Sequence, residues 1–224
     1  MKNRYIPIIF GLGGVLVLIS LSYWQVQRLN WKQNILTEIN KSLDVEPVEL
    51  NEDLLKKSNQ YLPIKSIGEV SGQEVHVLIS LKKRGAGYRL ISAFDTGKTK
   101  ILLDQGFISL EDKDAQRGPR NIHLIGNLYW PDEVDGFTPK PDKSKNIWFA
   151  RDIDEIAAEL KTKPFLVVAR SILPDHPTIM PLPVSAERIP NNHLQYAITW
   201  FLLSLVWLGM TLYFLWRMKI VTQR

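Results

Sequence analysis

The chain of 224 residues contains no cysteine. Disulfides, thiolate catalysis and cysteine-ligated metal sites are therefore excluded. A bacterial periplasmic domain can fold without disulfides, so the missing cysteines do not argue against export. Acidic residues are absent from both ends of the chain, because residues 1–24 and 193–224 contain neither Asp nor Glu.

Motifs of several large enzyme classes are missing as well. The sequence has no complete Gly-x-x-x-x-Gly-Lys-Ser/Thr phosphate loop, no Gly-x-Ser-x-Gly elbow and no His-Glu-x-x-His zinc motif. The basic, glycine-containing stretch at 82–87 fits a hairpin turn better than an anion cradle. Asp112 with Asp114 fits a loop, and Asp152 with Glu155 fits a helix cap, better than acid–base pairs. We therefore expect a protein that is not an enzyme.

The basic excess lies in the two tails. The formal net charge is +5, and five of the 28 Lys and Arg are Lys2, Arg4, Arg217, Lys219 and Arg224. The other 23 basic residues balance the 23 Asp and Glu, all of which lie between residues 25 and 192. This is the positive-inside pattern of membrane proteins and not a basic groove for phosphates. We expect both tails in the cytoplasm and no nucleic-acid partner.

Two uncharged runs are long enough to cross a membrane. Ile6–Trp24 has 19 residues and Ala197–Trp216 has 20. Twenty helical residues, at about 1.5 Å each, span about 30 Å of hydrocarbon core. A cleaved signal peptide is the alternative for the first run, with small residues at Ser20 and Ser22. We favour a retained anchor in contact with lipid, because the run is long and ends in aromatic residues suited to a membrane interface.

The middle of the chain is typical of an α+β domain. Trp31–Leu43 has its apolar residues on one face of a helix, and we expect that face to pack on its own domain rather than on a partner. A second helix starts near Asp152, and 131–145 and 174–190 are expected to be a surface loop and a proline-rich connector. Strand-like segments lie at 62–67, 74–81, 88–94, 100–109 (broken at Gly106), 122–130 and 165–172. This order predicts a mainly antiparallel sheet, curled toward a barrel.

Three of the four histidines lie in this middle region. His76 and His123 occupy outward positions of predicted strands, so we expect both to be solvated. His176 lies between two prolines in the predicted connector. None of the three has a partner at the spacing of a metal site.

The fourth histidine, His193, stands at the start of the second apolar run. Asn191 or Asn192 can cap the helix there, which places His193 in its first turn at the membrane boundary. The positive end of the helix favours a neutral imidazole, the form that binds metals. Tyr196 and Trp200 follow at helical spacing and could flank a flat macrocycle whose iron His193 ligates. The alternative is an interfacial cap beside an aromatic belt.

Six fragments, in order along the chain, are similar to segments of the Surfeit-1 family. They are Trp24-Gln25-Val26-Gln27-Arg28 with Trp31-Lys32; Tyr61, Pro63 and Gly68; Gly87-Tyr88; Ile101 to Ile108; Trp148-Phe149-Ala150-Arg151-Asp152; and Asn191-Asn192-His193-Leu194-Gln195-Tyr196, running into Thr199-Trp200. The resemblance covers nearly the whole chain. It departs from the family at Asp104 and Gln105, where the family usually has Asn-Arg, so any role of that basic residue is not carried over.

The resemblance implies an assembly factor for haem-copper cytochrome c oxidase that binds haem a or delivers it to the catalytic subunit. Some bacterial members bind haem a through the histidine that matches His193, which makes haem a the implied cofactor and His193 its metal ligand, with Tyr196 and Trp200 beside it. The oxidase catalytic subunit is the implied partner, and haem a synthase is a second candidate. A scaffold that stabilises an assembly intermediate without haem is the alternative. A periplasmic enzyme on two anchors is a third hypothesis, and the missing catalytic motifs speak against it.

These observations predict two transmembrane α-helices flanking an α+β, mainly antiparallel and barrel-like periplasmic domain. We expect a cytoplasmic tail at 1–5, a membrane helix at 6–24, the periplasmic domain at 25–192, a second membrane helix at 193–216 and a cytoplasmic tail at 217–224. The expected location is the inner membrane of a bacterium.

Overall fold

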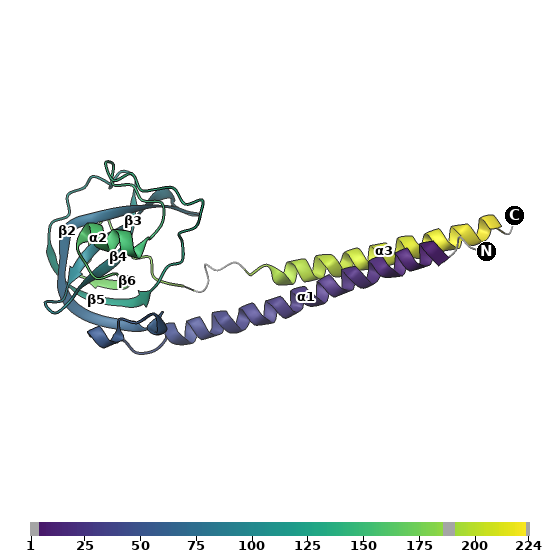
Figure 1. Cartoon of the computed structure of the whole chain (residues 1–224), viewed down its shortest axis with the longest axis horizontal. Coiled ribbons are helices and arrows are strands. Elements are labelled where there is room, and N and C mark those ends of the chain that lie inside the picture. The colour runs from purple at the N-terminus through teal and green to yellow at the C-terminus, as the bar shows by residue number, and fades with distance from the viewer. Residues whose placement is uncertain (1–4, 186–190, 223–224) are drawn as a thin grey trace. The chain divides into compact units, whose positions relative to one another are not determined.

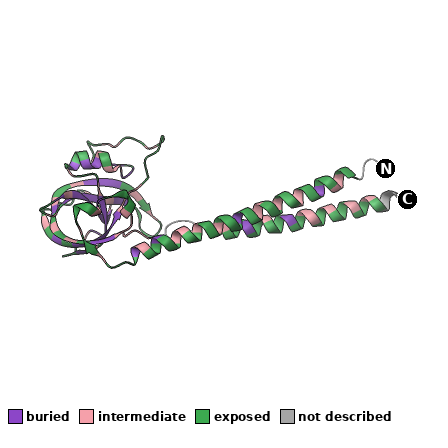
Figure 2. Cartoon of the chain, turned by 60° about the horizontal axis from the view of Figure 1, so that its bottom comes forward, coloured by how far each residue is buried: buried purple, intermediate pink, exposed green. Residues whose placement is uncertain are grey.

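The computed structural model of the chain describes residues 5–185 and 191–222. The chain divides into two compact units. A helical unit combines the residues up to Glu38 with those from Ala186 onward, and a sheet unit comprises Ile39–Ser185. Buried residues are concentrated in the sheet unit, whereas most of the helical unit is exposed or half-buried (Figure 2).

Two long helices form the helical unit, where they lie side by side and run in opposite directions (Figure 1). α1 (Tyr5–Leu43) and α3 (His193–Thr222) are both long and apolar enough to cross a membrane. Only 6% of the most apolar stretch of each helix is buried within the chain, unlike the core helix of a soluble protein. The apolar side chains are therefore available to lipid, and the pair indicates a membrane protein.

Small residues bring the two helices together. A Cβ added to Gly11 would collide with Thr211, and one added to Gly14 would collide with the indole of Trp207. The Trp207 Nε1–H also donates to the Gly11 carbonyl oxygen at 3.1 Å. Close backbone approach at small residues is typical of packing between membrane helices.

The sheet unit is built on six strands in the order β1-β2-β3-β4-β6-β5 (Figure 1). β2 also pairs with β5, so the five longer strands form a closed ring of pairings. Four pairings are antiparallel, and two, β1–β2 and β4–β6, are parallel, which confirms a mainly antiparallel sheet. The strands are β1 (Val48–Glu49), β2 (Pro63–Leu81), β3 (Gly85–Asp95), β4 (Lys100–Ser109), β5 (Arg120–Tyr129) and β6 (Leu166–Leu173). Three short helices complete the unit: the 3-10 helices η1 (Glu52–Leu54) and η2 (Lys57–Asn59), and α2 (Ile153–Leu160).

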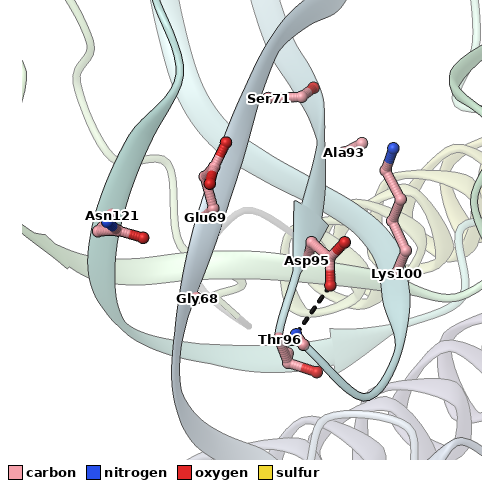
Figure 3. Close-up of a pocket in the computed structure, with 9 residues that line it drawn as sticks. Gly68, Glu69, Ser71, Ala93, Asp95, Thr96, Lys100 and Asn121 are labelled. Carbon is pink, nitrogen blue, oxygen red and sulfur yellow. Dashed lines mark hydrogen bonds between the residues drawn. The ribbon is translucent and has the colours of Figure 1, made fainter.

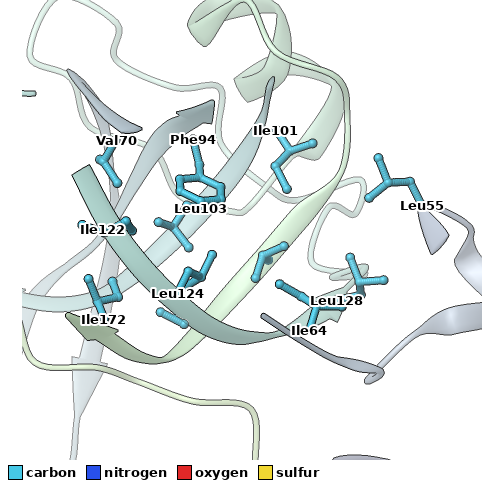
Figure 4. Packing of buried hydrophobic residues seen from close by; sticks show 12 residues of the cluster. Leu55, Ile64, Val70, Phe94, Ile101, Leu103, Ile122, Leu124, Leu128 and Ile172 are labelled. Carbon is cyan, nitrogen blue, oxygen red and sulfur yellow. The ribbon is translucent and has the colours of Figure 1, made fainter. Parts of the chain in front are cut away.

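Two large apolar clusters cover different faces of the sheet. Figure 4 shows the first, in which side chains from five strands point toward one another. Neighbouring residues of β4 alternate between the clusters: Ile101 and Leu103 belong to the first, and Leu102 belongs to the second with Trp148 and the apolar face of α2. Because both faces of β4 are covered, a continuous apolar run is stable in this strand.

The segments predicted at 62–67 and 74–81 form one strand, β2, of 19 residues. Its first half pairs with β5 and its second half with β3, and the register with β3 shifts between Val70 and Glu74. The polar residues 71–73 therefore form an irregularity in a continuous strand. The prediction of two strands was wrong because one strand serves both neighbours in the ring.

The break predicted at Gly106 is a bulge. The β3–β4 register shifts between Leu90 and Ile91, so Gln105 is the extra residue. Gly106 has a φ of 129°, and a Cβ there would collide with the backbone of Met180. Glycine is required at this position both by its conformation and by the segment that crosses it.

His76 is buried, contrary to the prediction that it is solvated; it is 5% exposed. The His76 ring lies beside Tyr88, with ring centroids 5.7 Å apart, and the Trp148 N–H pairs with the edge of β2 by donating to the His76 carbonyl oxygen at 2.9 Å. The His76 Nε2 lies 2.8 Å from Glu74 Oε1. His123 is exposed, as predicted, and His176 lies in a loop.

The helix predicted at Trp31–Leu43 is the last part of α1. Ile39 and Leu43, which belong to the sheet unit, are buried there, and the Leu43 carbonyl oxygen accepts from Arg170 Nη2 at 2.6 Å. Packing on its own domain is therefore confirmed for the end of this helix. Trp31 is 48% exposed, with the Arg28 guanidinium 3.9 Å from its ring centre.

Candidate functional site

His193 is the first residue of α3 and is half-buried against α1. Its Nδ1 lies 2.8 Å from Oε1 of Gln25, a residue that is itself only 9% exposed. Because the amide oxygen can only accept a hydrogen bond, a hydrogen bond at this contact requires the tautomer with hydrogen on Nδ1. In the neutral ring Nε2 then holds the lone pair that a metal requires. Within residues 5–185 and 191–222, Nε2 has no hydrogen-bond partner.

A second polar contact joins the helices one turn away. The Ser22 hydroxyl donates to the Ala197 carbonyl oxygen at 2.9 Å. Ala197 is 4% exposed, and its small side chain permits this approach. The contacts Gln25–His193 and Ser22–Ala197 together fix how far one helix is shifted along the other.

The other predicted site residues lie on the same helix as His193. Trp200 is half-buried and Tyr196 is 55% exposed. Neither side chain forms a hydrogen bond with Gln25 among the described residues. Of the two residues predicted to cap α3, Asn191 does not do so through its side-chain oxygen, because Asn191 Oδ1 is buried without a hydrogen-bond partner among the described residues.

Asp104 is fully buried in β4, where it belongs to a network of ion pairs in the sheet unit. Its Oδ2 accepts from Arg89 Nη1 at 2.5 Å and lies 3.3 Å from Arg151 Nη1. Arg151 also binds Glu133, whose Oε2 accepts from the Arg151 backbone N–H at 3.0 Å. The network ties β3, β4 and the start of α2 to the loop that follows β5.

Charge pairing shifts the pKa values of Glu133 and Arg151 in this network. Burial alone would raise the pKa of Glu133, but the hydrogen bonds and charge of Arg151 outweigh it and lower that pKa. Burial would likewise lower the pKa of Arg151, but Glu133 and Asp104 raise it. Glu133 and Arg151 therefore each stabilise the charged form of the other, which compensates for the desolvation of both groups.

Gln105, the extra residue of the bulge, has hydrogen-bond partners at both polar atoms of its side chain. Its Nε2 donates to the Ser92 hydroxyl at 2.8 Å, and its Oε1 accepts from Arg120 Nη2 at 2.6 Å. Asp104 and Gln105 thus have structural partners within the sheet unit. Sequence reasoning missed these partners because they lie on other elements of the sheet unit.

Figure 3 shows a surface pocket of about 460 Å³ beside the turn between β3 and β4. Glu69, Asp95, Lys100 and Asn121 contribute polar groups. Asp95 Oδ1 accepts from the Gly97 N–H at 2.8 Å, so this carboxylate stabilises the turn. Among the described residues, no group of three or more His, Asp and Glu side chains is placed to hold a metal ion.

Comparison with known proteins places this architecture in a family. Residues 12–205 match the SURF1 family. The chain belongs to the SURF1 family. Surfeit locus protein 1 of Homo sapiens is 29% identical over 213 residues, which cover 83% of this chain and 69% of that protein. The protein of the same name from Xenopus tropicalis is 27% identical over 211 residues, covering 81% and 67%. A SURF1-like protein of Rickettsia prowazekii is 31% identical over 206 residues, covering 85% and 82%.

Membership in the SURF1 family supports a role in oxidase assembly, as the resemblance in the sequence implied. The fragment Trp148-Phe149-Ala150-Arg151-Asp152, which carries part of that resemblance, has a structural role here. Trp148 is 2% exposed in the second apolar cluster, and Arg151 binds the buried network. Asp152 caps α2 by accepting the Glu155 N–H at 3.0 Å. This fragment attaches the start of α2 to the sheet.

Proposed function

We propose that this chain is a membrane-anchored assembly factor, and not an enzyme, for a haem-copper cytochrome oxidase. Membership in the SURF1 family supports the role, and two exposed apolar helices support the anchoring. The oxidase catalytic subunit is the proposed partner, and haem a synthase, as the source of haem a, is a second one. Lipid covers the outer faces of the helices.

The proposed topology places the sheet unit in the bacterial periplasm and both tails in the cytoplasm. The charge distribution supports it, since the tails hold basic residues without any acidic one. The contact between Gln25 and His193 is consistent with it, because it brings the predicted outer ends of both membrane segments to one level. The closed ring of strand pairings, which we propose forms a small barrel, would give the periplasmic domain a rigid body for partner contact.

His193 would hold haem a during transfer, and this hydrogen-bonded imidazole is the observation that carries the proposal. Gln25 accepts the Nδ1 hydrogen and leaves Nε2 free on a half-buried ring. Tyr196 and Trp200 lie one and two turns further along α3, where aromatic faces suit a macrocycle. Haem a itself supplies redox-active iron to the oxidase. The protein would bind and orient this cargo and shield it from water.

A scaffold that does not bind haem is the second candidate. The same hydrogen bond favours it, because the Gln25–His193 contact also joins the two helices. In that case His193 would stabilise the helix pair, and the protein would hold an assembly intermediate of the oxidase.

Deletion of the gene tests the role in assembly. We expect lower haem-copper oxidase activity and less haem a in the membrane, while the oxidase subunits are still made. A copy carrying the exposed-site change His123→Ala should restore activity as well as the wild-type gene does. Unchanged oxidase activity in the deletion strain would contradict the proposed function in both of its forms.

A further inference from the structure

Gln25 is a polar amide in a place where an apolar side chain would be expected. It directly follows the uncharged run Ile6–Trp24 and is 9% exposed. Burying an amide costs free energy unless its polar atoms are hydrogen-bonded. Gln27, two positions further along α1, is exposed by contrast, and its Nε2 donates to the Tyr23 hydroxyl of the same helix at 2.6 Å. Gln25 is thus the glutamine of this segment that is directed at α3.

We propose that Gln25 is a positioning residue that sets the tautomer and orientation of His193 for haem a. The inference rests on the function proposed above. Histidines that bind metals usually donate their second ring N–H to an oxygen, which fixes the tautomer and makes the ligating nitrogen more basic. Gln25 Oε1, 2.8 Å from Nδ1, occupies the position of that oxygen.

Two further contacts along the helix pair keep Gln25 in register with His193. Ser22, about one turn before it, donates to Ala197, about one turn after His193. Trp207 bonds the Gly11 carbonyl oxygen further along the pair. A shift of either helix along its axis would break these contacts and separate Gln25 from the imidazole. The register of the helices therefore determines which ring nitrogen faces outward.

Nitrogen NMR of the full chain in lipid nanodiscs tests the inference directly, with 15N-labelled histidine at neutral pH. We expect the His193 signal, assigned by its loss in His193→Ala, to show hydrogen on Nδ1. In Gln25→Leu it should change toward hydrogen on Nε2, because free imidazole side chains prefer that form. Gln25→Glu keeps an acceptor and should keep hydrogen on Nδ1. Gln27→Leu is the matched control and should leave the signal unchanged.

Haem binding gives a second readout. If the protein binds haem a, Gln25→Leu should lower its affinity by about 10- to 100-fold, and Gln25→Glu should retain it with a shifted absorption spectrum. Hydrogen on Nε2 in the wild type, or an unchanged tautomer in Gln25→Leu, would overturn the positioning role whether or not haem binds. If the tautomers are as expected but the protein never takes up haem a, the haem step of the proposed function is contradicted. Gln25 would then only set the tautomer and orientation of the His193 ring.

Discussion

Nδ1 of His193 lies 2.8 Å from Oε1 of Gln25, although the two residues are 168 positions apart. This contact joins the middle of α1 to the first residue of α3 and decides which nitrogen of the imidazole is free. It predicts energetic coupling between the two side chains. Loss of either partner leaves a buried polar group unpaired, at a cost of about 1–3 kcal/mol.

The double variant Gln25→Ala/His193→Ala should therefore be less destabilised than the sum of the single variants, by about 0.5–3 kcal/mol. Thermal unfolding of the full chain in detergent, followed by circular dichroism, measures the effect. The exposed Gln27–Tyr23 pair serves as the control and should be additive. Strict additivity at Gln25 and His193 would show that the contact does not stabilise the pair.

The glycines of α1 predict that the same substitution at two neighbouring positions has very different effects on stability. Gly14→Leu should force the helices apart, because even a Cβ at this site collides with Trp207. We expect a loss of about 1–3 kcal/mol in the stability of the helix pair. Gly13→Leu should be tolerated, since nothing lies within 4 Å of a Cβ added there. Comparable losses in both variants, in the same unfolding assay, would contradict this packing.

The buried network predicts a large loss of stability when Asp104 is replaced. Asp104→Ala leaves Arg89 and Arg151 without their shared carboxylate and should destabilise the sheet unit by about 3–5 kcal/mol. Urea unfolding measures the loss, and the exposed Asp114→Ala should change stability little. A loss below about 1 kcal/mol at Asp104 would mean that the two arginines are compensated elsewhere.

Glu133 predicts a specific pH dependence. Its pKa in the folded state lies below the ordinary 4.5, so the unfolded chain binds its proton more tightly. The stabilisation is therefore present above about pH 4.5 and is lost as the pH falls through the lower, folded-state pKa. Glu133→Gln should cost about 1 kcal/mol at pH 7, a low figure because the carboxylate is 37% exposed and partly screened.

The stability difference between Glu133→Gln and the wild type should shrink as the pH falls below 4.5. Denaturant unfolding at several pH values checks this, with the exposed Glu111→Gln as the control. If the difference in unfolding free energy stays constant down to the lowest pH, the charge of Glu133 is not the cause of the stabilisation.

Local patterns were enough to predict much of the fold. β4 has the predicted bounds, Lys100–Ser109, because its apolar run is flanked by polar turns. The start of α2 was predicted from Asp152, since capping is a contact between near neighbours in the sequence. The apolar parts of both long helices were recognised from the absence of charge, but the continuation of α1 from residue 25 to Leu43 as one helix was not.

Features that depend on distant segments were missed. His76 was expected to be solvated, but its ring lies beside Tyr88 of β3 and 2.8 Å from Glu74 Oε1. Asp104 looked like an unexplained departure from the family, and its partners Arg89 and Arg151 lie on other elements. The same holds for Gln25, whose role is apparent only beside His193. No periodicity in one segment encodes such long-range pairs.

The proposed topology predicts where reporter fusions are active. Alkaline phosphatase fused at Lys140, in the loop after β5, should be active because this enzyme folds in the periplasm. A fusion after Arg224 should be inactive, because the basic tail stays in the cytoplasm. The opposite pattern would contradict a periplasmic sheet unit between two retained anchors.

The absorption spectrum of the full chain, purified from cells that make haem a, tests the central claim most directly. The wild type and His123→Ala should carry haem a, and His193→Ala should lose most of it while still inserting into the membrane. His76→Ala is a poor control, because that side chain is buried against Glu74. His193→Ala will also lose about 1–3 kcal/mol through the unpaired Gln25, so haem is compared per folded protein. As much haem a in His193→Ala as in the wild type would contradict the ligand role, and a wild type without haem would leave the scaffold as the function.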